Sequence, residues 1–246
     1  MAAYVASGML AASQDVEMGG MQLPCTIEMA ANAFFSKASV AMSGYAMLTS
    51  GNASLLMAHG TTAQKSVFAA RAFAGEWFGT MCLSEPQAGS SLSDVATRAT
   101  ADGAAFESDP LGPRYRLRGN KMWISAGEHE LTKNISHLVL AKAVDAQGRT
   151  QAGVKGLSLF IVPKWMVDAK GVLTGQRNDV SLAGLNHKLG YRGTTNTLLN
   201  FGEGKFLVNS DGAGALAGAV GYLVGKPGDG LRCMFHMMNE ARIGVG

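Results

Sequence analysis

The sequence predicts an α+β fold in which helices and strands occupy separate stretches of the chain: an N-terminal helical segment, an antiparallel β-barrel-like middle domain, and the start of a C-terminal helical domain. Apolar residues recur at helical spacing up to about residue 75, and short β-forming runs separated by Gly, Asp and Pro come after it. The helical pattern returns only at residue 228. Because the strands have no helices between them, an antiparallel sheet or barrel is favoured over a doubly wound parallel sheet.

Residues 1–75 are predicted to be part of an N-terminal helical domain with three helices. The first helix carries an apolar stripe after Pro24, formed by Ile27, Ala31 and Phe34. The second is a stretch rich in Ala and Met from Val40 to Met57. Thr61 and Gln64 have the spacing of a capping box, in which each side chain bonds the backbone amide of the other residue, and they predict the start of a third helix.

Residues 76–210 are predicted to form the β-rich middle domain. The predicted strands are Gly79–Ser84, Asp94–Ala101, Tyr115–Arg118, Lys121–Ser125, Ser136–Ala143, Leu157–Val162 and Thr197–Phe201. The dipeptide Gly119-Asn120 is typical of a tight turn. It is therefore expected to connect the third strand to the fourth.

Residues 211–227 are predicted to be a glycine-rich insertion. Gly212, Gly214 and Gly218 resemble a dinucleotide-binding fingerprint, but their spacing is GxGxxxG and no βαβ unit surrounds them. A flexible surface insertion explains these glycines with fewer assumptions. Residues 228–246 then predict the first helix of a truncated C-terminal helical domain, with an apolar stripe of Leu231, Met234, Phe235 and Met238. Because this helix reaches Gly246 without a cap, we expect further sequence beyond it.

The composition excludes several classes of protein. With 47% hydrophobic residues and a net charge of +3, the chain does not resemble a disordered one. Its Lys and Arg residues are scattered, so no nucleic-acid partner is expected. The longest weakly polar stretch, Gly212–Leu223, is too short to cross a membrane, and no charged segment followed by an apolar block marks an export signal. We therefore expect a cytoplasmic protein without a membrane span.

The cysteines and histidines do not have the spacing of a metal site. Cys25, Cys82 and Cys233 lie far apart in the sequence, and each is predicted to be a small buried hydrophobe in a reducing compartment. His129 is flanked by two glutamates, but its helical i, i+4 partner is Lys133. A solvated loop is therefore expected at His129, and no metal is expected in the protein.

Two segments each place a strand end next to a glycine-bounded loop. In Met81–Ser90 the strand ends at Ser84, a Glu-Pro pair stops the ladder, and Gly89-Ser90 offers amides and a hydroxyl that could meet a phosphate. In Gly119–Gly127 a strand presents the Trp123 indole and then a serine hydroxyl. Together the two segments could hold one flat ring system with polar edges. The alternative is that Trp123 is a core residue and that each segment is an ordinary strand and turn.

At these residues the chain resembles the acyl-CoA dehydrogenase family, over about Pro24 to Gly246. The family patterns (Thr/Ser)-Glu-Pro-x-Ala-Gly-Ser-Asp and Gly-x-Lys-x-Trp-Ile-(Thr/Ser)-x-Gly occur here in order and at the family's separation. Further similar segments are Lys188–Thr194 with Phe201, Gly228–Leu231 and Asn239–Ile243. Gly184–Thr197 is most similar to the larger branch that includes 3-methylmercaptopropionyl-CoA dehydrogenases. Two residues depart from the family pattern: Ser91 stands at its usual Asp and Asn196 at a frequent threonine.

The resemblance implies the fold of this family and FAD as the cofactor. It places cofactor contacts at Met81, Leu83, Ser84, Gly89, Ser90, Trp123, Ile124 and Ser125. Leu83 and Ser84 would bind the pyrimidine edge of the flavin, Ser90 would lie near the pyrophosphate, and Ser125 would point towards the flavin N5. Substrate contacts are implied at Ser90, Thr194, Asn239 and Arg242.

The implied reaction is the FAD-dependent α,β-dehydrogenation of an acyl-CoA thioester to the trans-2-enoyl-CoA, by a homo-oligomer that passes electrons to electron-transferring flavoprotein. An acyl-CoA oxidase and a non-catalytic CoA- or flavin-binding fragment are the alternatives. The family's base is a glutamate, either beyond the position of Gly246 or immediately before the arginine that matches Arg242. Ala241 stands there, and Glu240, one residue earlier, points about 100° away on a helix. We therefore expect no catalytic residue in this chain, with Glu240 as the weaker candidate.

Overall fold

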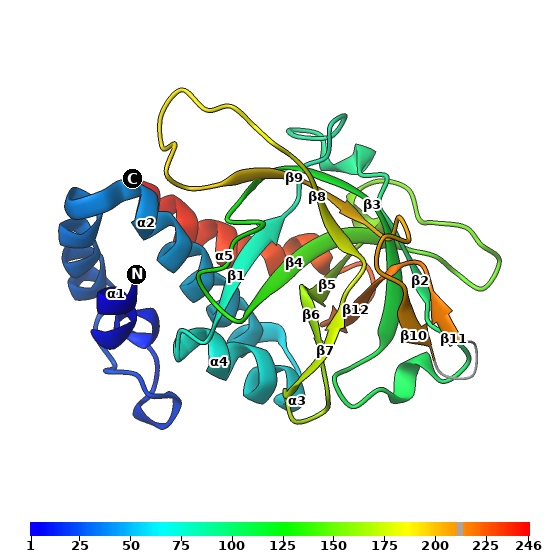
Figure 1. Ribbon diagram of the computed structural model, residues 1–246, viewed down its shortest axis with the longest axis horizontal. Helices are drawn as coiled ribbons and strands as arrows, with labels where there is room; N and C mark the ends of the chain where they lie inside the picture. Colours follow the sequence, from blue (N-terminus) through cyan, green and yellow to red (C-terminus); the bar gives the residue numbers. More distant parts are fainter. Residues whose placement is uncertain (211–213) are drawn as a thin grey trace.

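The computed structural model describes residues 1–210 and 214–246, with the helices gathered at one end of the molecule and the strands at the other (Figure 1). The helices are α1 (Ala2–Ala6), α2 (Cys25–His59), α3 (Thr62–Gln64), α4 (Ala70–Phe73) and α5 (Gly230–Val245). A π-helical turn, Lys65–Ala69, joins α3 to α4. The predicted order of helices, strands and a final helix is thus the order that the described residues adopt.

One long helix, α2, spans the stretch for which two helices were predicted. It is one element with a kink at Ser39, where φ is −162° and ψ is 97°. The predicted apolar stripe on its first half is wrong, since Ile27 is 53% exposed and Phe34 is 76% exposed. The buried residues of α2 begin at Gly44. Helical periodicity can show that one face is apolar, but tertiary packing decides whether anything covers that face.

The capping box at the start of α3 is confirmed. The Gln64 amide donates to Thr61 Oγ1 at 3.2 Å, and the Thr61 amide donates to Gln64 Oε1 at 3.1 Å. Gln64 is fully buried, and its side-chain amide also donates to the carbonyls of Leu111 and Leu223. The cap therefore also connects the helical end of the molecule to the strands.

The main sheet runs in the order β1-β4-β5-β12-β3-β9-β8, and β2 pairs with both β3 and β4. The strands of the described residues are β1 (Trp77–Cys82), β2 (Arg98–Ala101), β3 (Arg114–Ser125), β4 (Asn134–Ala143), β5 (Leu157–Pro163), β6 (Trp165–Val167), β7 (Leu173–Arg177), β8 (Val180–Leu185), β9 (Asn196–Phe201), β10 (Val208–Ser210), β11 (Gly214–Leu216) and β12 (Ala219–Val224). Because β2 bridges β3 and β4, the strands β2, β3, β12, β5 and β4 close into a ring. The middle of the chain is therefore barrel-like, as predicted.

The prediction of an antiparallel arrangement holds for most pairs and is wrong for two. β1 and β4 pair in parallel over Trp77–Cys82 and Asn134–Val139, and β2 also pairs in parallel with β4. Two other strands, β2 and β3, lie between β1 and β4 in the sequence. The chain thus returns to β1 through a long connection, which is what a parallel pair requires.

The turn predicted at Gly119-Asn120 is wrong, because β3 is one continuous strand. Its first half pairs with β2 and β12, and its second half pairs with β9. Gly119 has φ +154°, and a Cβ there would lie 2.4 Å from Thr97 Oγ1. The glycine is needed for this close approach rather than for a reversal of the chain.

The surface insertion predicted for residues 211–227 is also wrong for the part that the structure describes. Ala219–Val224 forms β12, which is buried along its whole length between β5 and β3. Gly214 belongs to β11, and Gly212 lies outside the described residues. The missing side chain of Gly221 allows close packing, since a Cβ there would meet the side chains of Leu117 and Val162 within 3 Å. A high glycine content was thus compatible with a central strand.

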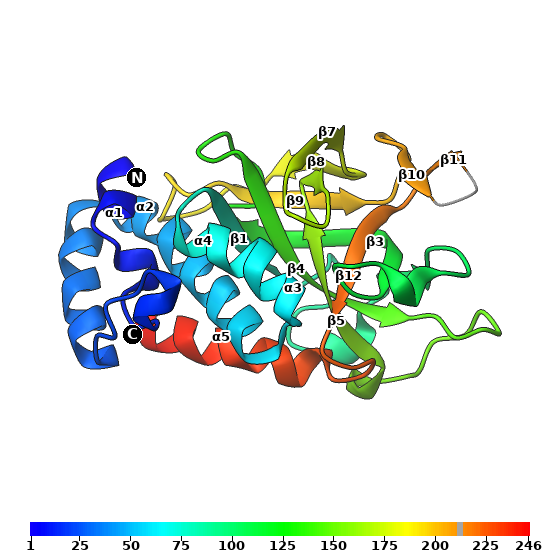
Figure 2. The same cartoon turned by 90° about the horizontal axis from the view of Figure 1, so that it is seen from below.

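Helix α5 lies alongside α2 in both views (Figures 1 and 2). Met234, as predicted, and Met237 are buried in this contact, whereas Phe235 of the predicted stripe is 40% exposed. Two of the cysteines, Cys82 and Cys233, are buried, and Cys25 is exposed, contrary to its prediction. Cys25 begins α2, whose first half carries no buried residue.

Helix α2 docks on the parallel pair β1–β4 through polar side chains. Asn52 is fully buried, and its Nδ2 donates to the carbonyls of Thr80 at 3.1 Å and Ser136 at 3.0 Å. The Gly79 amide donates to Thr49 Oγ1 at 3.1 Å. A Cβ on Gly79 would lie 2.5 Å from Asn52 Cβ and Cγ. The helix can therefore approach β1 only because residue 79 is glycine.

Replacing Gly79 with Ala is expected to lower the free energy of unfolding by about 1–3 kcal/mol, because the added methyl group collides with Asn52 and separates α2 from β1. Urea unfolding followed by circular dichroism measures the change. Gly184→Ala in β8 is the control, since nothing lies within 4 Å of its Cβ position, and it is expected to change stability by less than about 0.5 kcal/mol. Equal effects of the two substitutions would contradict this account of the helix contact.

Candidate functional site

The two segments singled out in the sequence lie side by side. The Met122 amide of β3 donates to the Ser84 carbonyl at 3.0 Å, just beyond the end of β1. Lys121 Nζ donates to the neighbouring Leu83 carbonyl at 2.9 Å. The structure therefore brings Met81–Ser90 and Trp123–Ser125 together at one edge of the barrel.

Trp123 is turned out of the sheet by an irregularity in β3. The pairing of β3 with β9 shifts register between Lys121 and Ile124, as at a β-bulge. Trp123 has φ +64°, a left-handed backbone that is costly for a bulky side chain, and its side chain is 56% exposed. It is therefore not a core residue, and its indole is accessible to a ligand.

The two residues after Trp123 form hydrogen bonds with β9. Ile124 is buried, and its carbonyl accepts a hydrogen bond from Thr197 Oγ1 at 3.0 Å. Ser125 is partly buried, and Asn196 Nδ2 approaches its hydroxyl at 3.5 Å. The end of β3 thus presents the Ser125 hydroxyl one residue beyond a buried isoleucine.

The β1 side of the site presents small neutral groups. Met81 and Ser84 are partly buried, and Gly89 and Ser90 are exposed. Leu83 is buried, so only its backbone is placed to contact a ligand. Within residues 1–210 and 214–246, neither the Ser84 nor the Ser90 hydroxyl has a hydrogen-bond partner. Both hydroxyls are therefore available for a ligand.

A buried ion pair beneath these segments was missed in the sequence. Lys121 Nζ lies 2.9 Å from Glu85 Oε1, and both side chains are almost completely buried. Burial raises the pKa of Glu85, but the Lys121 ammonium and the hydrogen bonds from Thr97 and Ala96 outweigh it and hold that pKa below its ordinary value. The signal in the sequence was an acidic residue, Glu85, in the first motif and a basic residue, Lys121, in the second. Each lies close to apolar residues, where a buried charge needs a partner.

The loop after β3 is held by charged groups and is not solvated as predicted. Glu128 pairs with Lys164 and, at 2.7 Å, with Arg177. The His129 ring packs edge-on against Tyr45 and Phe78, and burial together with the Lys164 charge lowers the pKa of His129 to about 4. His129 is therefore neutral at neutral pH and helps to dock the loop on α2.

The predicted substrate residues are divided among three places, one of which is the loop that carries Ser90. Thr194 is buried, and its hydroxyl donates to the Ala41 carbonyl of α2 at 2.5 Å. Asn239 and Arg242 are exposed on α5, where Arg242 Nη1 donates to Asn239 Oδ1 at 2.8 Å. The structure brings Asn239 and Arg242 together, and it engages the Thr194 hydroxyl in a helix contact.

Glu240 lies against α2. One of its carboxylate oxygens is 3.3 Å from His236 Nε2, and the other would be 3.6 Å from a Cβ on Gly51. Burial, followed by the negative charge of Glu28, raises the pKa of Glu240 to about 7, against a hydrogen bond from Ser54. This pKa would suit a general base, but the carboxylate faces α2, and its side chain is 44% exposed.

A pH dependence follows from the raised pKa of Glu240. Because its pKa in the folded chain is about 7 and its ordinary value is 4.5, the fold favours the protonated form. The stabilisation is complete below the ordinary value and is lost as the pH rises through about 7. Glu240→Gln is expected to gain stability relative to the unmodified chain as the pH rises from about 5 to about 8.

Urea titrations at several pH values measure this difference. Glu203→Gln, at an exposed position, is the control. A stability difference between Glu240→Gln and the unmodified chain that does not vary with pH would contradict the assignment. The charges of Glu28 and Glu240 interact, so the difference between the two chains reports Glu240 together with its effect on Glu28.

Other kinds of site are not evident in the described residues. No group of three or more His, Cys, Asp or Glu side chains in residues 1–210 and 214–246 is placed to hold a metal ion. None of the helices in this part of the chain combines the length and the hydropathy needed to cross a bilayer. The edge that carries Trp123 and the serines is the candidate site.

The fold and this site agree with a known class of proteins. A profile of the acyl-CoA dehydrogenase middle domain matches residues 80–203, which include both segments of the site. The chain belongs to the acyl-CoA dehydrogenase family.

Among its relatives, the chain is 38% identical over 245 residues to 3-methylmercaptopropionyl-CoA dehydrogenase of Ruegeria pomeroyi. The alignment covers 99% of this chain and 37% of that protein. It is similar in fold to ACDH-11 of Caenorhabditis elegans in complex with C11-CoA, with a TM-score of 0.73, 21% identity and coverage of 98% of this chain and 36% of the other. An acyl-CoA dehydrogenase of Bacillus anthracis complexed with FAD gives a TM-score of 0.69 at 21% identity, with the same coverage. The chain spans little more than a third of the length of these proteins.

Proposed function

We propose that this chain is the flavin-binding part of an FAD-dependent acyl-CoA dehydrogenase, which converts an acyl-CoA thioester to the trans-2-enoyl-CoA. The observation that carries the proposal is the hydrogen bond from the Met122 amide to the Ser84 carbonyl, which joins two motifs far apart in the sequence next to an exposed indole. The solved relative complexed with FAD has the same fold. Membership of the family supports the reaction class.

The residues at the site fit FAD by their chemistry. Trp123 offers a flat apolar face, while Ser84, Ser90 and Ser125 offer neutral hydroxyls. Bound FAD would supply the acceptor for the hydride that leaves the β-carbon of the thioester. Neutral donors along the flavin edge stabilise the negative charge that reduction brings, so their placement suits this chemistry.

Each part of the chain has a separate role in this proposal. Ser84 and the Leu83 backbone orient the pyrimidine edge, Ser125 lies towards N5, and Trp123 excludes water from one side of the ring. Gly89 and Ser90 hold the pyrophosphate with backbone amides and a hydroxyl. The base that removes the α-proton is proposed to lie in sequence outside this chain.

The partners are also proposed by family likeness. Ser90, Asn239 and Arg242 are proposed to contact the acyl-CoA, whereas Thr194 is buried with its hydroxyl donated to Ala41 and is not proposed as a contact. Electron-transferring flavoprotein is the proposed electron acceptor, and the whole protein is proposed to be a cytoplasmic homo-oligomer. An acyl-CoA oxidase is the second candidate, which hydrogen peroxide formed during turnover of the whole enzyme would reveal. A non-catalytic CoA-binding module is the third, and it would bind no flavin.

Adding FAD to the purified chain is expected to give a bound species with the yellow flavin absorption band after gel filtration. Ser84→Ala or Ser125→Ala is expected to weaken FAD binding by about 1 kcal/mol per hydrogen bond lost, or roughly five-fold. Ser66→Ala is the control, because Ser66 is exposed on the turn between α3 and α4. A colourless chain would refute the flavin proposal.

A further inference from the structure

Glu85 accepts hydrogen bonds from several parts of the chain at once. Its carboxylate receives the amides of Ala96 at 2.7 Å and Thr97 at 3.1 Å, and the Thr97 hydroxyl at 2.5 Å. Gln87 Nε2 and Lys121 Nζ complete the set at 2.7 and 2.9 Å. Hydrogen bonds to Glu85 therefore join the two ends of the loop from Glu85 to Thr97, which contains Gly89 and Ser90.

Lys121 extends this contact to β3. Besides Glu85 Oε1, its ammonium binds the Leu83 carbonyl at 2.9 Å, and the next residue, Met122, binds the Ser84 carbonyl through its amide. Three successive residues after β1 are thus held by two successive residues of β3. Trp123 follows them directly, so its position depends on the same contacts.

The packing around the ion pair shows the same constraint. A Cβ on Gly119 would lie 2.4 Å from Thr97 Oγ1, the hydroxyl that donates to Glu85. β3 therefore passes close enough to Thr97 only because residue 119 has no side chain. The ammonium, the carboxylate and Thr97 form one dry cluster between the loop and the strand.

Stability alone gives little reason for charges at this position. A buried ion pair must be desolvated, and well-packed apolar residues of similar volume are often as stable or more stable. What an ion pair adds is a fixed geometry, because the ammonium and the carboxylate each require hydrogen-bond partners at set distances and angles. Here the partners are the backbone groups of the two segments that present Ser84, Ser90 and Trp123.

We propose that Glu85 and Lys121 are positioning residues that set the spacing between the two FAD-binding segments. Both side chains are buried, so each would act on FAD binding through the backbone it holds. The inference rests on the proposed function, since FAD is the ligand whose site is set.

The test compares three variants of the 246-residue chain. Lys121→Met removes the ammonium, and Glu85→Gln with Lys121→Met removes both charges, so that no uncompensated charge is buried if the single variant folds poorly. Arg116→Met is the matched control, because Arg116 lies on the same strand and forms a buried ion pair with Asp102 at 2.7 Å. Circular dichroism and urea unfolding are used first to find conditions in which all three variants are folded.

Two readouts then separate positioning from stability. Without FAD, hydrogen exchange of the Thr97 and Met122 amides is expected to be faster in both Lys121 variants than in Arg116→Met. With FAD, the dissociation constant is expected to rise about ten-fold or more in both Lys121 variants and to stay within about two-fold in the control.

The outcomes distinguish this inference from the proposed function. If the unmodified chain binds FAD and the Lys121 variants bind it as tightly as Arg116→Met does, the positioning role is refuted and the proposed function stands. If the unmodified chain binds no FAD, the proposed function is refuted, and this inference with it.

Discussion

The 246-residue chain, loaded with FAD and mixed with an acyl-CoA and an artificial electron acceptor, is expected to reduce none of the acceptor. General-base catalysis is worth about 10²–10⁴ in rate, and the reaction needs a base within hydrogen-bond reach of the α-proton. Ala241 stands immediately before Arg242, and the Glu240 carboxylate packs against α2 beside His236 and Gly51. An open flavin site would also admit water.

The alternative is that Glu240 is the base, which its pKa of about 7 would favour. Acceptor reduction is measured by absorbance, with the flavin content of each sample determined first. Turnover by the unmodified chain that Glu240→Gln abolishes would overturn the expectation and assign the base to Glu240. Glu203→Gln serves as the control, since this residue is exposed on the loop after β9.

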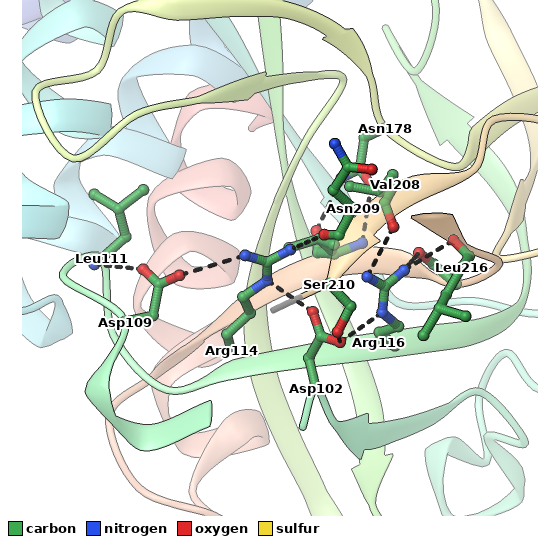
Figure 3. A network of polar contacts seen from close by, with 12 residues as sticks. Asp102, Asp109, Leu111, Arg114, Arg116, Asn178, Val208, Asn209, Ser210 and Leu216 are labelled. Carbon is green, nitrogen blue, oxygen red and sulfur yellow. Dashed lines mark hydrogen bonds and ion pairs between the residues drawn. The ribbon is translucent and has the colours of Figure 1, made fainter. Parts of the chain in front are cut away.

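Replacing Asp102 with Ala is expected to lower the free energy of unfolding by about 3–5 kcal/mol, because it leaves the buried Arg116 guanidinium without a counterion and leaves Arg114 only the longer contact with Asp109 at 3.8 Å. Asp102 Oδ1 accepts from Arg116 Nε at 2.7 Å and from the Ser210 hydroxyl at 2.7 Å, and Oδ2 lies 2.8 Å from Arg114 Nε (Figure 3). Arg116 also binds the carbonyls of Val208 and Leu216, so it holds the β10–β11 pair to β3 (Figure 3).

Urea unfolding followed by circular dichroism measures this loss. Glu76→Ala is the control, since Glu76 is 55% exposed and its contact with Arg71 is 4.0 Å long, and it is expected to cost less than about 1 kcal/mol. A loss below 1 kcal/mol in Asp102→Ala would show that the two arginines find other partners. The network would then contribute little to the barrel.

Several elements could be predicted from the sequence because their causes are local. The Thr61–Gln64 capping box lies within one helical turn, and its two hydrogen bonds formed as expected. The change from helical to alternating periodicity near residue 75 separated the helices from the strands. The motif order also predicted that the Ser84 and Trp123 segments would meet, and the Met122–Ser84 hydrogen bond joins them.

Other elements could not be predicted because their causes are far apart in the chain. Nothing in the sequence near β1 or β4 shows that they pair in parallel, since that pairing depends on the path of β2 and β3 between them. Gly119 resembled a turn residue and Gly221 a linker residue. In the structure both glycines admit a neighbouring strand or side chain at close range.

The sequence by itself determined the α+β class, the family, the α3 cap and the two segments of the candidate site, because each depends on short-range periodicity or on motif spacing. Only the tertiary structure decided the ring closed by β2, the burial of β12 and the pairing of Glu85 with Lys121. These three features bring together residues from distant parts of the chain. Burial and ion pairing act through space, and a sequence pattern records only neighbours along the chain.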